Sequence, residues 1–399
     1  MSFHNSQGGN KMTKRSKLFS LLSIALVFAL VVAGCGGAKD PKPGETASDV
    51  IKVGIFEPLT GDNAAGGQLT LNGMKLANKL YPEVLGKKVE LVVVDNKSER
   101  AEAANAVARL IDNDNVSVIL GSYSSGLSMA GGQIAKDKEV PVIGCSPTNP
   151  LVTLDNDYYF RVCFIDPFQG AVMANYAINE LGVTKAAIIK ENGSDYSVGL
   201  ARFFYNAFTE AGGEIVADID YQKGDNDFTA QLGSIESAKP EVIFAPGDFG
   251  PSALLIKQAR EMGIELPFLG GDTWEVGEFL ELGGKEVNGA TFSSHFTADE
   301  PATAMTQTFL DAFKAEYPNE NPNAFAALGF DTYILALDAM NRADSSDREA
   351  IKDALADTKD FMGATGIIIL DENGDATKSA VVNQVVDGNF KFKIIIEPK

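Results

Sequence analysis

The hydrophobic positions of this chain fall into short apolar runs that alternate with longer amphipathic stretches. In the first part of the chain the apolar runs cover residues 51–56, 89–94, 116–120 and 141–144. The amphipathic stretches cover residues 68–81 and 98–111 and a helix-length segment after Gly126. Short apolar runs bounded by polar loops predict buried strands, and amphipathic stretches predict helices. Because strand and helix alternate, we expect parallel strands joined by right-handed crossovers in one doubly wound lobe. Ser98 is expected to cap the second helix, and residues 59–67 to form a loop.

The same alternation returns after an extended run at residues 158–164. Helices are expected at residues 169–180, 198–211, 228–237 and 252–262, and strands at residues 186–190, 215–219, 242–245 and 267–269. We place the first crossing between two lobes in the extended run. Lobe 1 is expected to hold residues 51–164 and 295–360, and lobe 2 residues 165–294 and 361–399. Two similar lobes joined by extended crossings form a cleft that closes about a hinge, so the prediction is an α/β fold of two doubly wound lobes.

The C-terminal part follows a different pattern, with three helices expected between residues 302 and 357. Strands are expected at residues 367–370, 381–386 and 390–396. They are separated by Asn373-Gly374 and Asp387-Gly388, which are strong hairpin signals. The acidic residues 371–375 superficially suggest a calcium loop, but the full ligand spacing is missing and a turn is predicted.

Hydroxyl-bearing loops follow two neighbouring strands of the first lobe. Ser122–Gly126 follows one strand and Ser146–Asn149 follows the next. The carboxyl ends of parallel strands meet at one edge of a sheet, so both loops should converge there. Hydroxyl groups, free backbone amides and a helix N-terminus hold a small anion. The pattern predicts a carboxylate-binding cleft, and the competing role of these hydroxyls is simple capping of a helix or turn.

Length and composition narrow the class of protein. The 399 residues exceed one ordinary hydrophobic core and favour two domains. The net charge of −20 argues against a nucleic acid partner, which requires a basic surface. The two histidines, His4 and His295, leave little basis for a metal site or for histidine-based catalysis, and no cofactor is expected. Cys145 and Cys163 are expected to be buried free thiols.

The N-terminus has the pattern of a targeting segment. Four basic residues between positions 11 and 17 precede an uncharged run from Leu18 to Val32, as in a signal peptide. Val32-Ala33-Gly34-Cys35 resembles the lipobox of bacterial lipoproteins, which implies cleavage after residue 34 and lipidation of Cys35. Residues 35–50 then form a tether. Cleavage removes four basic and no acidic residues, so the exported chain would carry 30 basic and 54 acidic residues, a net charge of −24. It is expected on the extracytoplasmic face of the cell membrane.

Several short motifs occur in a fixed order along the chain. They are Pro58-Leu59-Thr60-Gly61, Gly121–Ser125, Val140-Pro141 with Thr148-Asn149-Pro150, Phe160-Arg161, Tyr196 with Gly199-Leu200, Gly224–Phe228 and Lys257–Arg260. No single motif is specific, but their order and spacing resemble the substrate-binding proteins of branched-chain amino acid ABC transporters, the leucine/isoleucine/valine-binding kind. The resemblance covers nearly all of the chain after the targeting segment, and it implies the type I periplasmic-binding-protein fold.

The resemblance also implies roles for individual residues. The α-carboxylate of a bound amino acid would be held by Ser125, by Ser146 through its backbone, and by the Thr148 hydroxyl. The α-ammonium would be held by Asp272 of the second lobe, and Tyr196 would close over the ligand. Each lobe would then grip one end of the zwitterion, and closure would remove both ends from water.

Two positions depart from the pattern of the family. Gly66 stands where an aromatic residue commonly lies against the ligand side chain, and Asp248 stands at another position that is often aromatic. Loss of a ring enlarges the pocket, and an additional carboxylate can bind a second donor group of the ligand. Trp274 either fills part of this space or is only a packed surface aromatic. An amino acid ligand is therefore expected, with branched-chain side chains favoured.

The prediction is a binding protein that acts as a monomer, closes on an amino acid and delivers it to the permease of an ABC importer. An enzyme with Glu57 and Asp272 as a carboxylate pair is a competing function, but the sequence contains no nucleophile elbow, G-x-G-x-x-G or Walker motif. A sensor with the same fold is a second competing function. A binding protein for a different amino acid or a small amide is a third.

Overall fold

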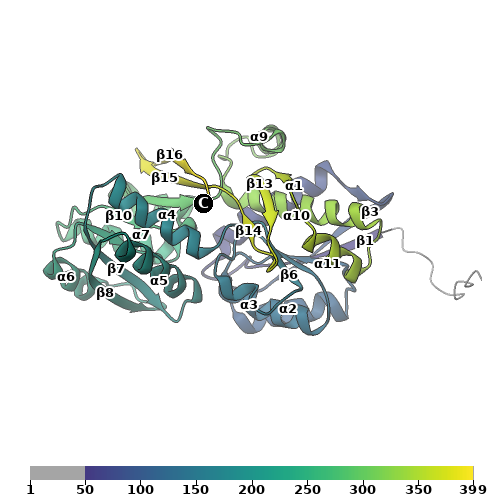
Figure 1. The fold of residues 1–399 in the computed structure, drawn as a ribbon, viewed down its shortest axis with the longest axis horizontal. Helices are drawn as coiled ribbons and strands as arrows, with labels where there is room; N and C mark the ends of the chain where they lie inside the picture. The colour runs from purple at the N-terminus through teal and green to yellow at the C-terminus, as the bar shows by residue number, and fades with distance from the viewer. Residues whose placement is uncertain (1–49, 399) are drawn as a thin grey trace, which may run out of the picture. The chain divides into compact units, whose positions relative to one another are not determined.

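The computed structural model describes residues 50–398, which form two main β-sheets with helices packed on both faces (Figure 1). The first sheet has the strand order β2-β3-β1-β4-β5-β6. Its strands are β1 (Val50–Glu57), β2 (Glu83–Val84), β3 (Lys87–Asp95), β4 (Val118–Leu120), β5 (Val142–Gly144) and β6 (Tyr159–Arg161). All pairings are parallel except that of β2 with β3. Helices α1 (Ala64–Leu80), α2 (Arg100–Asp112) and α3 (Ser125–Asp137) connect them.

The second sheet has the strand order β16-β15-β11-β10-β9-β7-β8. Its strands are β7 (Lys185–Asn192), β8 (Glu214–Gln222), β9 (Val242–Phe244), β10 (Phe268–Gly270), β11 (Thr291–Ser294), β15 (Ala380–Val386) and β16 (Asn389–Ile396). Its helices are α4 (Asp166–Asn179), α5 (Asp195–Glu210), α6 (Thr229–Ala238), α7 (Phe249–Glu261) and α8 (Gly277–Gly283). The five strands from β7 to β11 pair in parallel, so the prediction of two doubly wound α/β lobes is confirmed.

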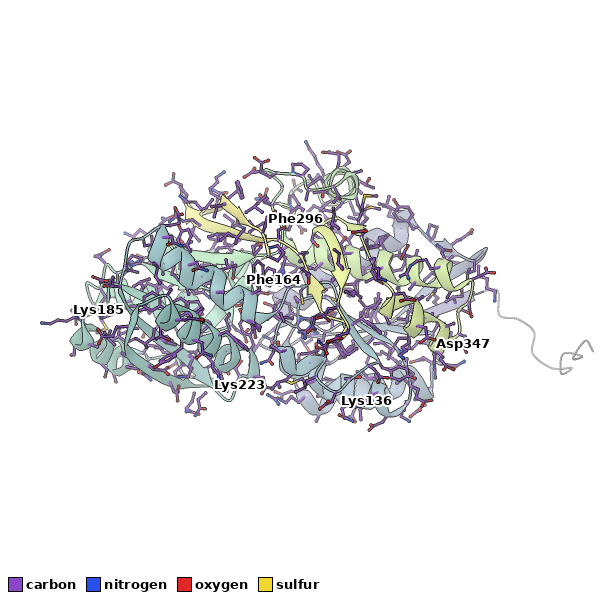
Figure 2. The ribbon with its side chains drawn as sticks, in the orientation of Figure 1. Lys136, Phe164, Lys185, Lys223, Phe296 and Asp347 are labelled. Atoms are coloured by element: carbon purple, nitrogen blue, oxygen red, sulfur yellow. The ribbon has the colours of Figure 1, made fainter. Side chains whose placement is uncertain are left out.

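Three chain crossings join the two sheets. The first follows β6 and carries Phe164, the second follows β11 and carries Phe296, and both residues are labelled between the lobes in Figure 2. The third lies between β14 (Ala376–Thr377) and β15. A small sheet of β12 (Phe361–Gly363), β13 (Gly366–Leu370) and β14 precedes the third crossing.

Helices α9 (Ala304–Glu316), α10 (Ala324–Ala343) and α11 (Arg348–Ala356) form the predicted helical segment. Helix α10 packs closely on α1 through two glycines. A Cβ added at Gly73 would lie 1.8 Å from the Ala326 carbonyl oxygen, and one added at Gly329 would lie 2.1 Å from the Thr70 carbonyl oxygen. The absence of a side chain at both positions therefore lets the two backbones approach, and α10 covers the first sheet although it comes late in the sequence.

Several element boundaries differ from the prediction. Helix α1 begins at Ala64, so Gly66 lies in its first turn rather than in a loop. Ser98 does not cap α2, because Glu99 is the N-cap. Instead the Ser98 hydroxyl donates to the Thr60 carbonyl at 2.8 Å and accepts from the Asn63 amide at 3.0 Å, which ties two loops together. Helix α8 and strand β11 were not predicted.

The two predicted turns are confirmed. Asp387 and Gly388 both have positive φ, 49° and 70°, and join β15 to β16 in a two-residue hairpin. In the acidic segment the Gly374 amide donates to the Asp371 carbonyl at 3.0 Å, which closes a turn. Among residues 50–398, no helix has the length and apolar character needed to cross a membrane.

Candidate functional site

The carboxyl-terminal ends of strands from both sheets meet around one small inner cavity. The lining residues come from the loops after β4, β5, β9 and β10 and from the starts of α3, α5 and α10: Tyr123, Ser124, Ser125, Ser146, Ser194, Tyr196, Asp248, Asp272, Thr273 and Phe325. Its free volume of ≈ 10 Å³ is about that of one water molecule. A wider outer cleft of ≈ 460 Å³ adjoins it and shares four of these residues. The lobes must therefore open to admit a ligand larger than water.

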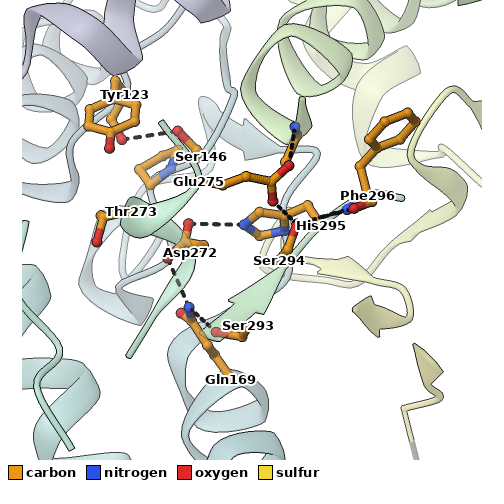
Figure 3. Close-up of polar contacts among 12 residues, drawn as sticks. Tyr123, Ser146, Gln169, Asp272, Thr273, Glu275, Ser293, Ser294, His295 and Phe296 are labelled. Carbon is orange, nitrogen blue, oxygen red and sulfur yellow. Dashed lines mark hydrogen bonds and ion pairs between the residues drawn. The ribbon is translucent and has the colours of Figure 1, made fainter. Parts of the chain in front are cut away.

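Asp272 lies at the centre of a buried polar network at this cavity (Figure 3). Its Oδ1 accepts hydrogen bonds from Gln169 Nε2 and from the Tyr196 hydroxyl, both at 2.8 Å. Its Oδ2 lies 3.0 Å from His295 Nε2. A carboxylate has about four lone-pair positions, so these three partners leave one acceptor position at Oδ2. Asp272 is thus held rigidly and can still receive a donor from the cavity.

His295 is the functional neighbour that the sequence analysis missed. It lies on the second crossing, and its ring stacks on Phe164 of the first crossing with the ring centroids 3.8 Å apart. Burial lowers the pKa of His295 despite its hydrogen bond to Asp272. The neutral ring therefore donates from Nε2 to Asp272, and its Nδ1 has no partner among the described residues. The only signal in the sequence was the rarity of histidine in the chain.

Two of the predicted carboxylate-binding residues line the cavity. Ser125 is the first residue of α3, and its hydroxyl accepts from the Asn149 amide at 3.2 Å. The Ser146 hydroxyl donates to the Tyr123 carbonyl at 3.1 Å, which leaves its oxygen lone pairs and its backbone amide for other partners. Ser124 at the N-cap makes no side-chain cap, so the first turn of α3 retains free amides beside the cavity.

Thr148 does not line the cavity. Its Oγ1 is buried without a hydrogen-bond partner within the described part of the chain, and both oxygens of Asp166 are in the same situation. Burial raises the pKa of Asp166 to about 8, while the nearby Thr148 hydroxyl acts in the opposite direction. Thr148 thus faces Asp166 at the N-terminus of α4 and does not face the inner cavity.

The Tyr123 ring fills the space beside Gly66, where the sequence analysis expected an enlarged pocket. A Cβ added at Gly66 would lie 2.1 Å from the Tyr123 ring, so the ring packs directly on the backbone of α1. The other side of the ring makes an edge contact with Phe325, with centroids 4.9 Å apart. Glycine at position 66 therefore does not empty the pocket, because an aromatic ring from the loop after β4 fills the space.

Asp248 lines both the inner cavity and the outer cleft, at the N-cap of α7. It caps no backbone amide of that helix, and its Oδ2 accepts from Asn63 Nδ2 of the first lobe at 3.0 Å. Burial raises the pKa of Asp248. Trp274 is fully buried and stacks on Phe279 with centroids 4.9 Å apart, so it belongs to the core of the second lobe.

Polar contacts hold the lobes together around the outer cleft. Lys223 of the second lobe, which is labelled in Figure 2, has its Nζ 3.2 Å from an Asp62 carboxylate oxygen and 3.8 Å from a Glu99 carboxylate oxygen of the first lobe. Arg100 pairs with Asp195, whose carbonyl also accepts from Asn149 Nδ2 at 2.7 Å. These contacts close the cleft between the lobes, and most of them are exposed and individually weak.

Glu57 lies behind the cavity and does not line it. Its Oε2 accepts from the Tyr123 amide at 2.8 Å, and the Cys145 thiol donates to its Oε1 at 3.4 Å. Cys145 and Cys163 are both buried free thiols, as predicted. Burial raises the pKa of Glu57 to about 8. Glu57 thus orients the loop that carries Tyr123 and does not form an open carboxylate pair with Asp272.

Exchange of Glu57 for glutamine is expected to flatten the pH dependence of stability. The folded protein keeps the Glu57 proton up to about pH 8, whereas an unperturbed glutamate loses it near pH 4.5. Unfolding therefore releases this proton between those values, and stability falls as pH rises, by up to about 1.4 kcal/mol per pH unit. Thermal unfolding between pH 5 and pH 8 measures this effect. The Glu57→Gln variant should become progressively more stable than wild type as the pH rises. The control variant Glu90→Gln, at an exposed position, should show the same pH dependence of stability as wild type. If Glu57→Gln also showed that dependence, the raised pKa of Glu57 would be contradicted.

Comparison with known proteins identifies the family. A sequence profile described as periplasmic binding protein matches residues 50–389. The chain belongs to the periplasmic binding protein family. The resemblance predicted from the motifs is thereby confirmed, and members of this family are solute-binding proteins that act outside the cytoplasm. The predicted signal peptide and the predicted lipidation site Cys35 lie outside the described residues.

Three relatives illustrate the place of the chain in the periplasmic binding protein family. A leucine-binding protein LivK from Thermotoga maritima is 42% identical, with a TM-score of 0.85 over 87% of this chain and 99% of that one. LivJ, a branched-chain amino acid transporter substrate-binding protein from Streptococcus pneumoniae solved with isoleucine, is 34% identical, with a TM-score of 0.82 over 88% and 100%. A Leu/Ile/Val-binding protein homolog from Brucella melitensis is 27% identical over 82% of this chain and 88% of its own length.

Proposed function

We propose that this protein is the extracytoplasmic solute-binding component of an ABC importer and binds an amino acid in the cleft between its lobes. The observation that carries the proposal is that hydrogen-bond donors of one lobe face a carboxylate acceptor of the other lobe across the inner cavity. Ser125, Ser146 and the free amides of α3 offer donors on the first lobe, and Asp272 offers a buried acceptor on the second. A zwitterion presents one carboxylate and one ammonium group, so it complements both walls at once.

The ligand would stabilise the closed form because it bridges the two lobes. Its α-ammonium would take the remaining acceptor position of Asp272, and Tyr196 would cover it from the second lobe. A ligand that binds the closed form better than the open one shifts the equilibrium toward closure by the difference in affinity. The names of the relatives favour a branched-chain amino acid, delivered by the closed protein to a membrane permease. We propose no catalytic role, because Glu57 is withdrawn from the cavity.

The hinge would divide the chain between the lobes as follows. The first lobe would hold residues 50–164 and 295–377, and the second residues 165–294 and 378–398. We propose this boundary in place of the expected one at residue 361. It is supported by two hydrogen bonds that tie residues 363–365 to helices of the first lobe: Thr303 Oγ1 donates to the Gly363 carbonyl at 2.7 Å, and Asp331 of α10 accepts from the Thr365 amide at 2.9 Å. A lipid anchor at Cys35 and action as a monomer complete the proposal and rest on the sequence alone.

Thermal unfolding of protein refolded to remove carried-over ligand tests this function. A ligand at about 100 times its dissociation constant should add about 2.7 kcal/mol to the free energy of unfolding and raise the midpoint by several degrees. The panel should include the twenty L-amino acids, short amides and urea. Stabilisation by one or more amino acids supports the proposal. Stabilisation only by an uncharged amide, or by no compound, would refute the zwitterion site.

A further inference from the structure

Two carboxylates line the same inner cavity, although an α-amino group supplies only one positive charge. Asp272 is surrounded by three donors and has one acceptor position left, as described above. Asp248 has a single hydrogen bond, from Asn63, and forms no ion pair within 4 Å among residues 50–398. Because three of the four lone-pair positions of Asp248 remain, this side chain has more unused acceptor capacity than Asp272.

A second polar group of the cavity lacks a partner. The Tyr123 side chain is 3% exposed, and its hydroxyl makes no hydrogen bond to the described residues although it lines the inner cavity together with Asp248. Burial of a hydroxyl without a partner is unfavourable, so a ligand group that forms a hydrogen bond with it contributes to binding. The unpaired Tyr123 hydroxyl is thus a second observation, independent of Asp248, that this wall of the inner cavity is polar.

The cations at the outer cleft are already engaged. Arg100 pairs with Asp195, and Lys223 lies between Asp62 and Glu99. Glu191 lines the outer cleft beyond Asp248, is 9% exposed, and has no cation within 4 Å among the residues described. Acceptor groups without a matching donor therefore extend from the inner cavity outward.

We propose that the side chain of the preferred amino acid carries an N–H donor, either cationic or amide, which Asp248 receives at the wall of the cavity. The inference rests on the proposed function, keeps an amino acid as the ligand, and replaces the aliphatic side chain that the names of the relatives favour with one that bears a donor. A purely aliphatic side chain at this wall would offer no partner to the buried Tyr123 hydroxyl or to the remaining acceptor positions of Asp248. An N–H donor of the ligand would form hydrogen bonds with these groups. Because Asn63 of the first lobe binds the same Asp248 carboxylate, the donor would also stabilise the closed form.

Calorimetric titration of the wild-type protein with lysine, arginine, glutamine, leucine, isoleucine and valine provides the first test. At least one of the three donor-bearing amino acids should bind at least about 10-fold more tightly than leucine. A greater affinity for lysine or arginine assigns a cationic donor, and a greater affinity for glutamine assigns an amide. Leucine, isoleucine or valine as the tightest ligand would overturn the inference and leave the proposed function standing. No binding by any amino acid would overturn both.

Two substitutions at Asp248 test the residue itself. Asp248→Asn keeps the shape and an acceptor for Asn63 but removes the charge, and it should weaken the donor-bearing ligand about 10- to 100-fold while leucine changes less than about threefold. Asp248→Leu should invert the preference toward leucine. The matched control is Asp220→Asn, which removes an exposed carboxylate of β8 that pairs with Lys190 at 2.9 Å and should leave all affinities unchanged. An unchanged ratio of affinities in Asp248→Asn would refute the role, provided that its ligand-free unfolding midpoint shows a folded protein.

Discussion

Exchange of Asp272 for asparagine is expected to abolish amino acid binding, with a rise in the dissociation constant of at least about 100-fold. The substitution removes the buried charge that would pair with the α-ammonium of the ligand. Removal of one partner from a buried ion pair typically costs about 3–5 kcal/mol, which corresponds to more than two orders of magnitude in affinity. Titration calorimetry with the best ligand of the wild-type protein measures this loss.

The fold of the Asp272→Asn variant should survive. The amide oxygen can still accept from Gln169 and Tyr196, and His295 can accept from the new amide in its other tautomer. An unfolding midpoint near that of wild type would therefore separate loss of binding from loss of structure. Asp311→Asn, which removes an exposed carboxylate of α9, should bind as wild type does. Wild-type affinity in Asp272→Asn would place the ammonium elsewhere and remove the main support for the proposed function.

Exchange of Arg161 for alanine is expected to lower the free energy of unfolding by about 3–5 kcal/mol. Arg161 is fully buried, and its Nε lies 2.7 Å from Asp375 Oδ1. Its other nitrogens donate to the Pro147 and Asn149 carbonyls at 2.6 and 2.8 Å and to Thr153 Oγ1 at 2.7 Å. The alanine variant would leave the buried Asp375 carboxylate without its cation and the Pro147 and Asn149 carbonyls without this donor.

Urea unfolding with linear extrapolation measures this change. The matched control is Arg109→Ala, because the Arg109 side chain is 58% exposed and lies 3.5 Å from Asp114. An exposed pair of this kind contributes about 0–1 kcal/mol, so the control should remain close to wild type. If Arg161→Ala lost no more than Arg109→Ala, Arg161 would not be the residue that holds the loop after β5 to the segment before the third crossing.

Local sequence patterns were sufficient for much of the fold. The apolar runs located most strands of both sheets, because a parallel strand buried on both faces needs a continuous apolar segment. Asp387-Gly388 located a hairpin, because few residues other than glycine, asparagine and aspartate adopt positive φ without strain. Helix α8 and strand β11 were not predicted from the sequence. The helix is short, and the strand contains Thr291, Ser293 and Ser294, so both lack the usual apolar pattern.

The sequence by itself determined the two doubly wound lobes, the family and the candidates Ser125, Ser146, Tyr196, Asp248 and Asp272 around one cavity. These features depend on local periodicity and on the common direction of parallel strands. Only the tertiary structure decided that Tyr123 fills the space at Gly66, that Thr148 faces Asp166, and that His295 supports Asp272. Each of those relations depends on side-chain direction or joins segments far apart in the chain. No local pattern encodes them, because they depend on how the helices and crossings pack against the two sheets.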